Sequence, residues 1–146
     1  ELKMAVDAKT GQPIFGRYDV GLHNVGSYQV SGWPWITGSV LADGQEDTIS
    51  FPMLTKSVTI IASGTMAADD DNVLRAHFAS TSSGEVFLGH HYVTFEGDDD
   101  SLTLNIKCKE LYLSAVGSGV GYEVVAELTN IPTGRMFTLT GSGITE

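Results

Sequence analysis

The chain has 146 residues, of which 42% are hydrophobic and 18% are charged, and its 8 basic and 18 acidic residues give a net charge of −10. This length and composition predict one globular domain, and the scattered cations exclude the continuous basic surface that binding to a nucleic-acid backbone requires. No apolar run reaches the roughly 18 residues of a membrane-spanning helix, so we expect neither a nucleic acid nor a membrane as a partner.

The first 25 residues differ from the rest of the chain. They mix Gly, Pro and isolated apolar residues without sustained alternation. Segments of this kind are ordered only where something holds them. We therefore expect an extended N-terminal arm over residues 1–25 and a single folded domain over residues 26–146.

The remainder of the chain consists of short segments that alternate between apolar and polar residues, separated by Gly- and Asp-rich turns. Such segments, rich in β-branched and aromatic residues, are typical of strands. The expected strands are 27–31, 35–41, 47–51, 57–63, 73–79, 86–95, 101–107, 110–115, 121–129 and 134–140. The pattern predicts an all-β fold, a single antiparallel β-sandwich that is jelly-roll-like, with a small β-barrel as the alternative.

Both tryptophans lie in the segment VGSYQVSGWPWITGS, residues 25–39. Pro34 restricts Trp33 to an extended conformation and cannot donate to a sheet, so the segment is expected at an edge or at the start of a strand. Trp33 and Trp35 are two residues apart and therefore point to the same side. With Tyr28 and Pro34 they form the candidate interface. The two indoles could cover one end of the sandwich, anchor a protein contact, or stack on a sugar.

Acidic and histidine clusters are weak candidates for a metal site. Asp69–Asp71 and Asp98–Asp100 lack the spacing of a calcium-binding EF-hand loop, and they are well explained as turns. His90 and His91, as neighbours on a strand, would point to opposite faces. We expect no metal.

Reactive groups have no recognisable frame in this sequence. The single cysteine, Cys108, lies in an alternating segment without the pattern of a nucleophile and is expected to be buried and inert. No nucleotide-binding glycine loop or nucleophile elbow occurs in a suitable context. We expect no catalytic residue and no cofactor, and hence a protein that is not an enzyme.

Five segments in order resemble small virion structural proteins of tailed phages, especially those of marine and aquatic bacteria. The segments are VGSYQVSGWPWITGS, ISFPMLTKSVTIIASG, LRAHFAST, SLTLNIKCKELYLS and YEVVAELTNIPTGRMFTLTGSGIT. The resemblance runs from about Gly21 to the C-terminus.

The resemblance implies a non-enzymatic component of the phage particle. Within that class it favours a capsid decoration (cement) protein that binds the outer surface of the major capsid protein shell, commonly as a homotrimer. A neck, tail or fibre component is the alternative, as is a glycan- or receptor-binding β-sandwich that uses Trp33 and Trp35. The expected location is the virion surface, after assembly in the bacterial cytoplasm.

Overall fold

The structure is a computed structural model that describes residue 22, residues 32–64 and residues 71–143. Apart from Leu22, the expected arm over 1–25 lies outside the described residues. The expected strand over 27–31 and the boundary between 25 and 26 also lie outside them.

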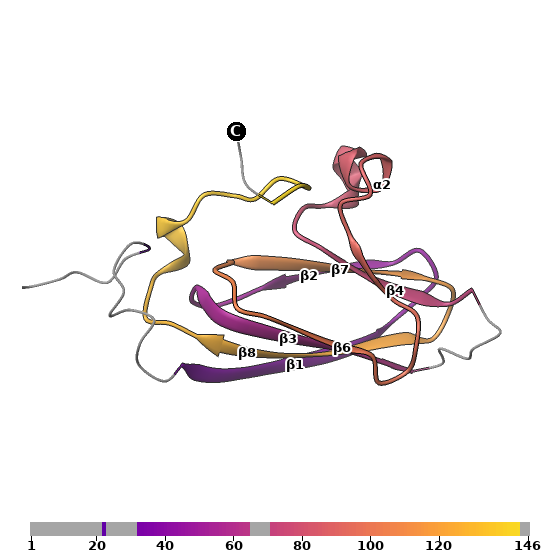
Figure 1. The fold of residues 1–146 in the computed structure, drawn as a ribbon, viewed down its shortest axis with the longest axis horizontal. Coiled ribbons are helices and arrows are strands. Elements are labelled where there is room, and N and C mark those ends of the chain that lie inside the picture. The colour runs from indigo at the N-terminus through magenta and orange to yellow at the C-terminus, as the bar shows by residue number, and fades with distance from the viewer. Residues whose placement is uncertain (1–21, 23–31, 65–70, 144–146) are drawn as a thin grey trace, which may run out of the picture.

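The described residues form two four-stranded antiparallel sheets packed face to face (Figure 1). The first sheet has the order β1 (Trp33–Leu41), β8 (Val120–Leu128), β3 (Thr55–Gly64) and β6 (Ser101–Leu104). The second has the order β2 (Glu46–Ser50), β7 (Glu110–Val116), β4 (Val73–His77) and β5 (Val93–Phe95). The predicted all-β, antiparallel sandwich is therefore confirmed.

Alternation along the strands builds the core between the sheets. In β8 every second residue from Val120 to Leu128 is buried, while Glu123, Val125 and Glu127 face outward. This period of two is what a strand with one buried face requires. The largest fully buried side chains of the sandwich interior are Leu41, Val58, Ile60, Leu74, Leu111, Leu113, Val120 and Val124.

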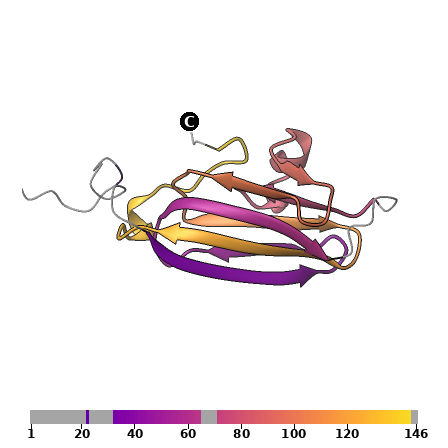
Figure 2. The same cartoon turned by 60° about the horizontal axis from the view of Figure 1, so that its bottom comes forward.

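The pairing of the strands is nested. β4 pairs with β5, β3 with β6, β2 with β7 and β1 with β8, so each pair encloses the previous one along the chain. Two further ladders, β3 with β8 and β4 with β7, join these pairs into the two sheets. Figure 2 shows the first sheet nearly face on, with β1 at its outer edge and β8, β3 and β6 following.

The predicted strand over 86–95 is wrong in its first half. Residues Thr81–Ser83 form the 3-10 helix η1, Glu85–Leu88 form the short helix α2, and only Val93–Phe95 is a strand. Gly84 and His90 have φ of +74° and +54°, which is left-handed backbone that interrupts a strand. The apolar residues between them fit one helical turn as well as a strand, so the pattern alone was ambiguous.

The predicted strand over 134–140 is also wrong. Residues Thr133–Arg135 form the 3-10 helix η2, and the only described pairing after it is an isolated bridge between Thr140 and Gly143. β8 already has β1 on one side and β3 on the other, so it offers no free edge to a following strand. Met136 instead packs with Leu54 and Ile131 in a small cluster separate from the main core.

Candidate functional site

Trp33, the first residue of β1, stands at one end of the sandwich. Its side chain is 64% exposed, and its indole Nε1–H donates to Asn130 Oδ1 at 2.9 Å. The hydrogen bond fixes the ring beside the loop that follows β8. An exposed and oriented indole of this kind is suited to contact another molecule.

Trp35 has a different environment from Trp33. Its ring is half-buried and packs edge-on against Phe51, with ring centroids 5.2 Å apart and an interplanar angle of 72°. Trp35 thus packs against the core, in agreement with the first of the three expected roles, which is to cover one end of the sandwich. Pro34 is exposed on the other face of β1, and Tyr28 lies outside the described residues. The two tryptophans are two residues apart on β1, and the structure gives them different environments.

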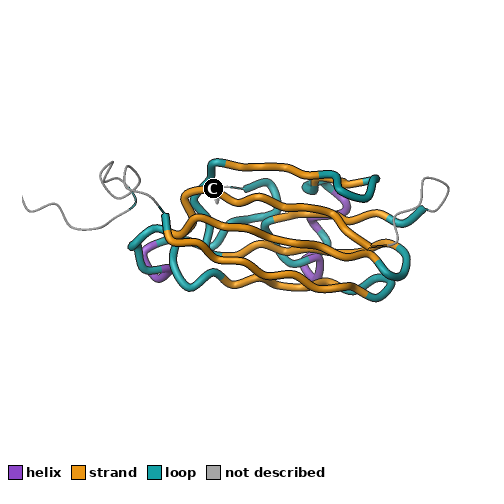
Figure 3. The backbone as a smooth tube through the Cα atoms, turned by 90° about the horizontal axis from the view of Figure 1, so that it is seen from below, coloured by secondary structure: helices purple, strands orange, loops and turns teal. Residues whose placement is uncertain are grey.

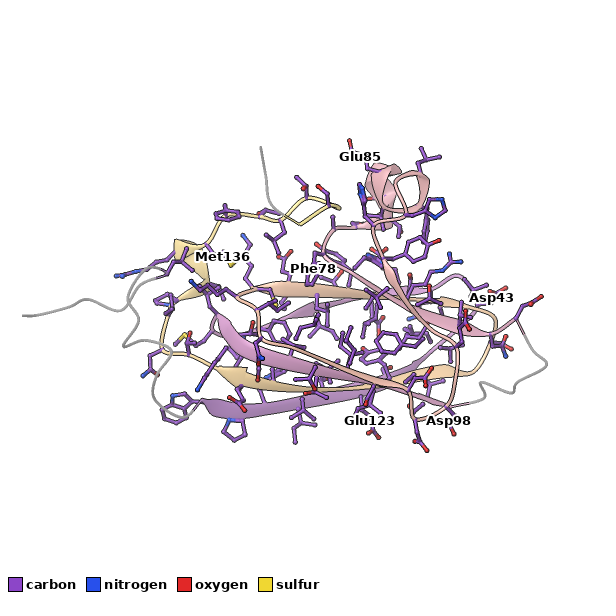
Figure 4. All side chains as sticks on the ribbon, viewed as in Figure 1. Asp43, Phe78, Glu85, Asp98, Glu123 and Met136 are labelled. Carbon is purple, nitrogen blue, oxygen red and sulfur yellow. The ribbon has the colours of Figure 1, made fainter. Side chains whose placement is uncertain are left out.

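The outer face of the first sheet carries exposed apolar side chains on β1, beside two outward-facing carboxylates on β8, Glu123 and Glu127. Ile36 is 71% exposed and Val40 65% exposed, and Ile36 lies opposite the partly exposed Val125 on β8. Across the same sheet the row continues with Thr59 and Thr103, whose hydroxyls lie 3.0 Å apart. Figure 4 shows Glu123 projecting from this side of the sandwich. These exposed side chains lie on an open sheet face, and such a surface suits protein contacts better than the enclosure of a small molecule.

The outer face of the second sheet is covered in part by the segment that contains η1 and α2 (Figures 1 and 3). Glu46 on β2 ties this segment down: its carboxylate accepts hydrogen bonds from the backbone N–H and hydroxyl of Thr81 and from the Ser80 hydroxyl. Burial alone would raise the pKa of Glu46. The bonds from Thr81 and Ser80, with His77 nearby, outweigh it and hold the pKa below its ordinary value.

His77 is buried beneath this segment. Its Nδ1 lies 2.7 Å from the carbonyl of Ala79, so Nδ1 carries the proton, and its Nε2 accepts from the Ser114 hydroxyl at 2.9 Å. Burial lowers the pKa of His77, against the Ala79 hydrogen bond and the Glu46 carboxylate 4.0 Å away, which favour the protonated ring. Because Ser114 is only 5% exposed, this serine–histidine pair stabilises the fold rather than facing a substrate. Sequence spacing did not indicate it, because register across β4 and β7 brings the two residues together.

Arg75 lies against aromatic rings on the same side of the molecule. Its guanidinium carbon is 4.6 Å from the centre of the Tyr92 ring and 5.4 Å from that of Phe87. Cation–π contacts of this kind hold an arginine in place without an acid. Phe87 and Leu88 next to it are exposed, so α2 presents a small apolar tip that carries little negative charge besides Glu85 (Figure 4).

The acidic cluster Asp98–Asp100 is a turn, as one of its two interpretations predicts. Asp100 Oδ2 accepts from the backbone N–H groups of Glu96 and Gly97, at 3.3 and 2.8 Å, and Asp99 has a φ of +67°. The carboxylate of Asp100 is therefore engaged by its own backbone. Of the cluster Asp69–Asp71 only Asp71 is described, and it is exposed.

Cys108 is buried beside Thr55, whose hydroxyl lies 3.3 Å from the sulfur. Burial raises the pKa of the thiol to about 11, against the lowering effect of that hydroxyl. A thiol that stays protonated near neutral pH is a poor nucleophile. The expectation of a buried cysteine is thus confirmed.

An apolar groove of about 430 Å³ lies between the segment before β7 and the C-terminal segment. It is lined mainly by Phe78, Ile106, Met136, Phe137 and Leu139. Lys107 at its border donates from Nζ to the carbonyl of Leu22 at 2.8 Å, and Leu22 packs against the Leu54–Ile131–Met136 cluster. Leu22 is therefore held at this end of the sandwich by both a hydrogen bond and apolar packing.

Among the described residues, no three or more His, Cys, Asp and Glu side chains are grouped to hold a metal ion, and no described helix is long and apolar enough to cross a membrane. Searches against protein-family models and curated proteins found no match to this chain. The surfaces described above are therefore the basis for a functional proposal.

Proposed function

We propose that the protein is a non-enzymatic structural component of a tailed-phage virion, a capsid decoration protein that binds the outer surface of the shell of major capsid protein. The observation that carries the proposal is the row of exposed apolar side chains, Ile36, Val40 and Val125, on the outer face of the first sheet, beside the carboxylates of Glu123 and Glu127. A decoration protein acts by adding contact area across a shell, and an open face with an apolar row supplies such area.

The fold supports the same proposal. Nested pairing of eight strands in two sheets is the connectivity expected of a jelly roll, an architecture used by viral capsid and lectin domains and by cupins. The net charge of −10 suits the outside of a DNA-filled shell, since a DNA-facing position would bring like charges together. A homotrimer is the symmetry that the resemblance to decoration proteins implies.

The experiment that tests the proposal is quantification of this chain in purified virions, followed by imaging of the particles with a labelled antibody. A decoration protein is present in proportion to the major capsid protein, and its label covers the head. A few copies per particle confined to the neck or tail would support the alternative neck, tail or fibre role. Absence from the particle would refute a virion role.

Trp33 carries the second candidate, a glycan- or receptor-binding module. Its exposed indole could stack on a sugar ring, but Trp35 packs on Phe51 and does not complete a two-ring platform. Titration of host-cell glycans against the protein and its Trp33→Ala variant separates the two functions. Saturable binding that Trp33→Ala abolishes would favour the glycan module, and equal weak signals from both proteins would remove it.

A further inference from the structure

β1 differs from the other edge strands of the sandwich. The described edges are β1 and β6 in the first sheet and β2 and β5 in the second. β5 has 3 residues, β6 has 4, and β2 has 5 of which two are acidic. Short length, charged side chains and proline are among the features by which proteins keep edges from pairing. β1 has 9 residues, WPWITGSVL, and none is charged; its one proline, Pro34, is its second residue and leaves residues 35–41 without such a feature.

The register shows which backbone groups of β1 point away from β8, its neighbour among the described strands. Pro34 has no N–H and cannot donate to β8, and hydrogen-bonding direction alternates along an antiparallel strand. The groups of Ile36, Gly38 and Val40 therefore point away from β8. A second observation agrees. On β3 the backbone N–H and C=O of Ala62 bond to Asp100 and Asp99, so they point away from β8, and the backbone groups of its register partner Tyr122 point away from β3, towards β1. Tyr122 lies opposite Ser39, so the backbone groups of Ser39 point towards β8 and those of Gly38 and Val40 point away from it.

We propose that β1 pairs with β1 of a second copy of this chain, antiparallel, about a two-fold axis at Gly38. In this register Ile36 lies opposite Val40 of the second copy, and Gly38 lies opposite Gly38. Each outward N–H and C=O of these residues meets its complement, so the edge is complementary to itself. The two first sheets join into one continuous sheet.

The side chains of β1 favour the second copy as the occupant. On the outer face, the exposed Ile36 would lie between Val125 of its own copy and Val40 of the other. Two chains of net charge −10 repel one another, so they have to meet along a strand without charged residues, as β1 is; the carboxylate of Glu123, opposite Gly38 on β8, is one strand away from the contact. Pairing one strand per copy buries less than the roughly 1,600 Å² of a standard interface, so we expect a reversible, concentration-dependent dimer.

The first experiment is sedimentation velocity of the full chain over a concentration series. We expect a monomer–dimer equilibrium that Ile36→Lys weakens at least tenfold, because the lysine enters the row between Val125 and Val40 of the second copy. Val40→Pro removes one outward N–H without touching the ladder to β8 and should also weaken the dimer. Thr103→Lys is the matched control: it adds the same charge to the same face, on β6, and should leave the equilibrium unchanged.

The second experiment tests the register by disulfide formation. Chains with Ile36→Cys and chains with Val40→Cys should crosslink when mixed under oxidising conditions, and neither should crosslink alone. Directly opposed residues in an antiparallel pair have Cα atoms about 5.5 Å apart, within the range of a disulfide. Cys108 is buried and does not compete.

The inference does not rest on the phage role, and it fails separately from it. A monomer at every concentration, crosslinking of either single variant alone, or a trimer that Ile36→Lys leaves intact would each overturn the pairing through β1. The last result would agree with the trimer of the proposed function. A dimer that responds equally to Ile36→Lys and Thr103→Lys would assign the effect to charge and would also overturn it.

Discussion

The hydrogen bond between Tyr122 and Asp47 links the two sheets, and its removal is the most direct test of the electrostatics inside the sandwich. The Tyr122 hydroxyl, on β8, donates to Asp47 Oδ2 on β2 at 2.9 Å. Tyr122→Phe removes the hydroxyl and keeps the ring, so it leaves no cavity. A hydrogen bond to a charged group contributes about 1.5–3 kcal/mol. Because Asp47 is half-buried and also accepts from the Gln45 side chain at 3.2 Å, we expect a loss near the lower end.

The assay is urea unfolding followed by tryptophan fluorescence, at pH 7 and then at higher pH. Tyr112→Phe is the control, since the Tyr112 hydroxyl donates to Glu110 on its own strand at 2.9 Å and is only half-buried. It should lower the free energy of unfolding by less than Tyr122→Phe does, because water can replace the bond of a half-exposed hydroxyl. Both variants keep a phenyl ring, so any difference between them reports the bond between the sheets.

The pH dependence gives an independent check. Burial, with the hydrogen bond to Asp47 and its charge, raises the pKa of Tyr122 to about 12. Between about pH 10 and 12 the Tyr122 hydroxyl therefore stays protonated in the folded protein, whereas it loses its proton in the unfolded chain. The contribution of this hydroxyl to the free energy of unfolding is fully present below about pH 10 and declines as the pH rises towards 12. The difference between wild type and Tyr122→Phe should be constant from pH 7 to 9 and smaller at pH 11. No difference at pH 7, or one that persists unchanged at pH 11, would refute the argument.

Three further predictions follow from buried groups and backbone geometry. Gly117→Ala should lower the free energy of unfolding by more than about 1 kcal/mol, because Gly117 has a φ of +87° and an added Cβ would overlap Asn72 Oδ1. Gly134→Ala is the control and should be nearly neutral, because nothing lies within 4 Å of an added Cβ there. Equal urea midpoints for the two variants would contradict this prediction. Cys108, with a pKa raised to about 11 by burial, should react with a thiol reagent at pH 8 only in urea, and rapid labelling of the native chain would show that the site opens. Burial lowers the pKa of His77, so as the pH falls the unfolded chain takes up this proton before the folded protein does. The free energy of unfolding should therefore decrease as the pH falls through the ordinary histidine pKa of about 6.5. His77→Gln should make the free energy of unfolding less dependent on pH between pH 7 and 5, and an unchanged dependence would count against His77 as its source.

The strands that alternate over a full length could be predicted from the sequence because one face of each is buried. The expected 57–63 and 121–129 correspond to Thr55–Gly64 and Val120–Leu128. The segments 86–95 and 134–140 could not be predicted correctly, since their residue types suit a strand. In 86–95 the left-handed backbone at His90 interrupts the strand, and after β8 no free edge remains for 134–140 to pair with. Both causes depend on the rest of the fold.

The candidate site shows the same division. The spacing of Trp33 and Trp35 predicted a shared side of an edge strand, and β1 is an edge strand. The spacing could not show that Phe51 covers one ring and Asn130 orients the other, because both contacts join residues far apart in the chain. The hydrogen bond between Ser114 and His77 could not be predicted either, because the two residues are far apart in the chain.

Nested pairing also sets the order in which the protein can be completed during synthesis. The hairpin of β4 and β5 is closest in sequence and can close early, whereas β1 pairs with β8, its only described ladder, across most of the chain. Contacts between distant segments carry the highest cost of loop closure and slow folding. β1 therefore leaves the ribosome before the other seven described strands and gains its partner among them only after β8 has followed. During that interval an uncharged strand of this length is exposed to other nascent copies, a condition that favours association between strand edges.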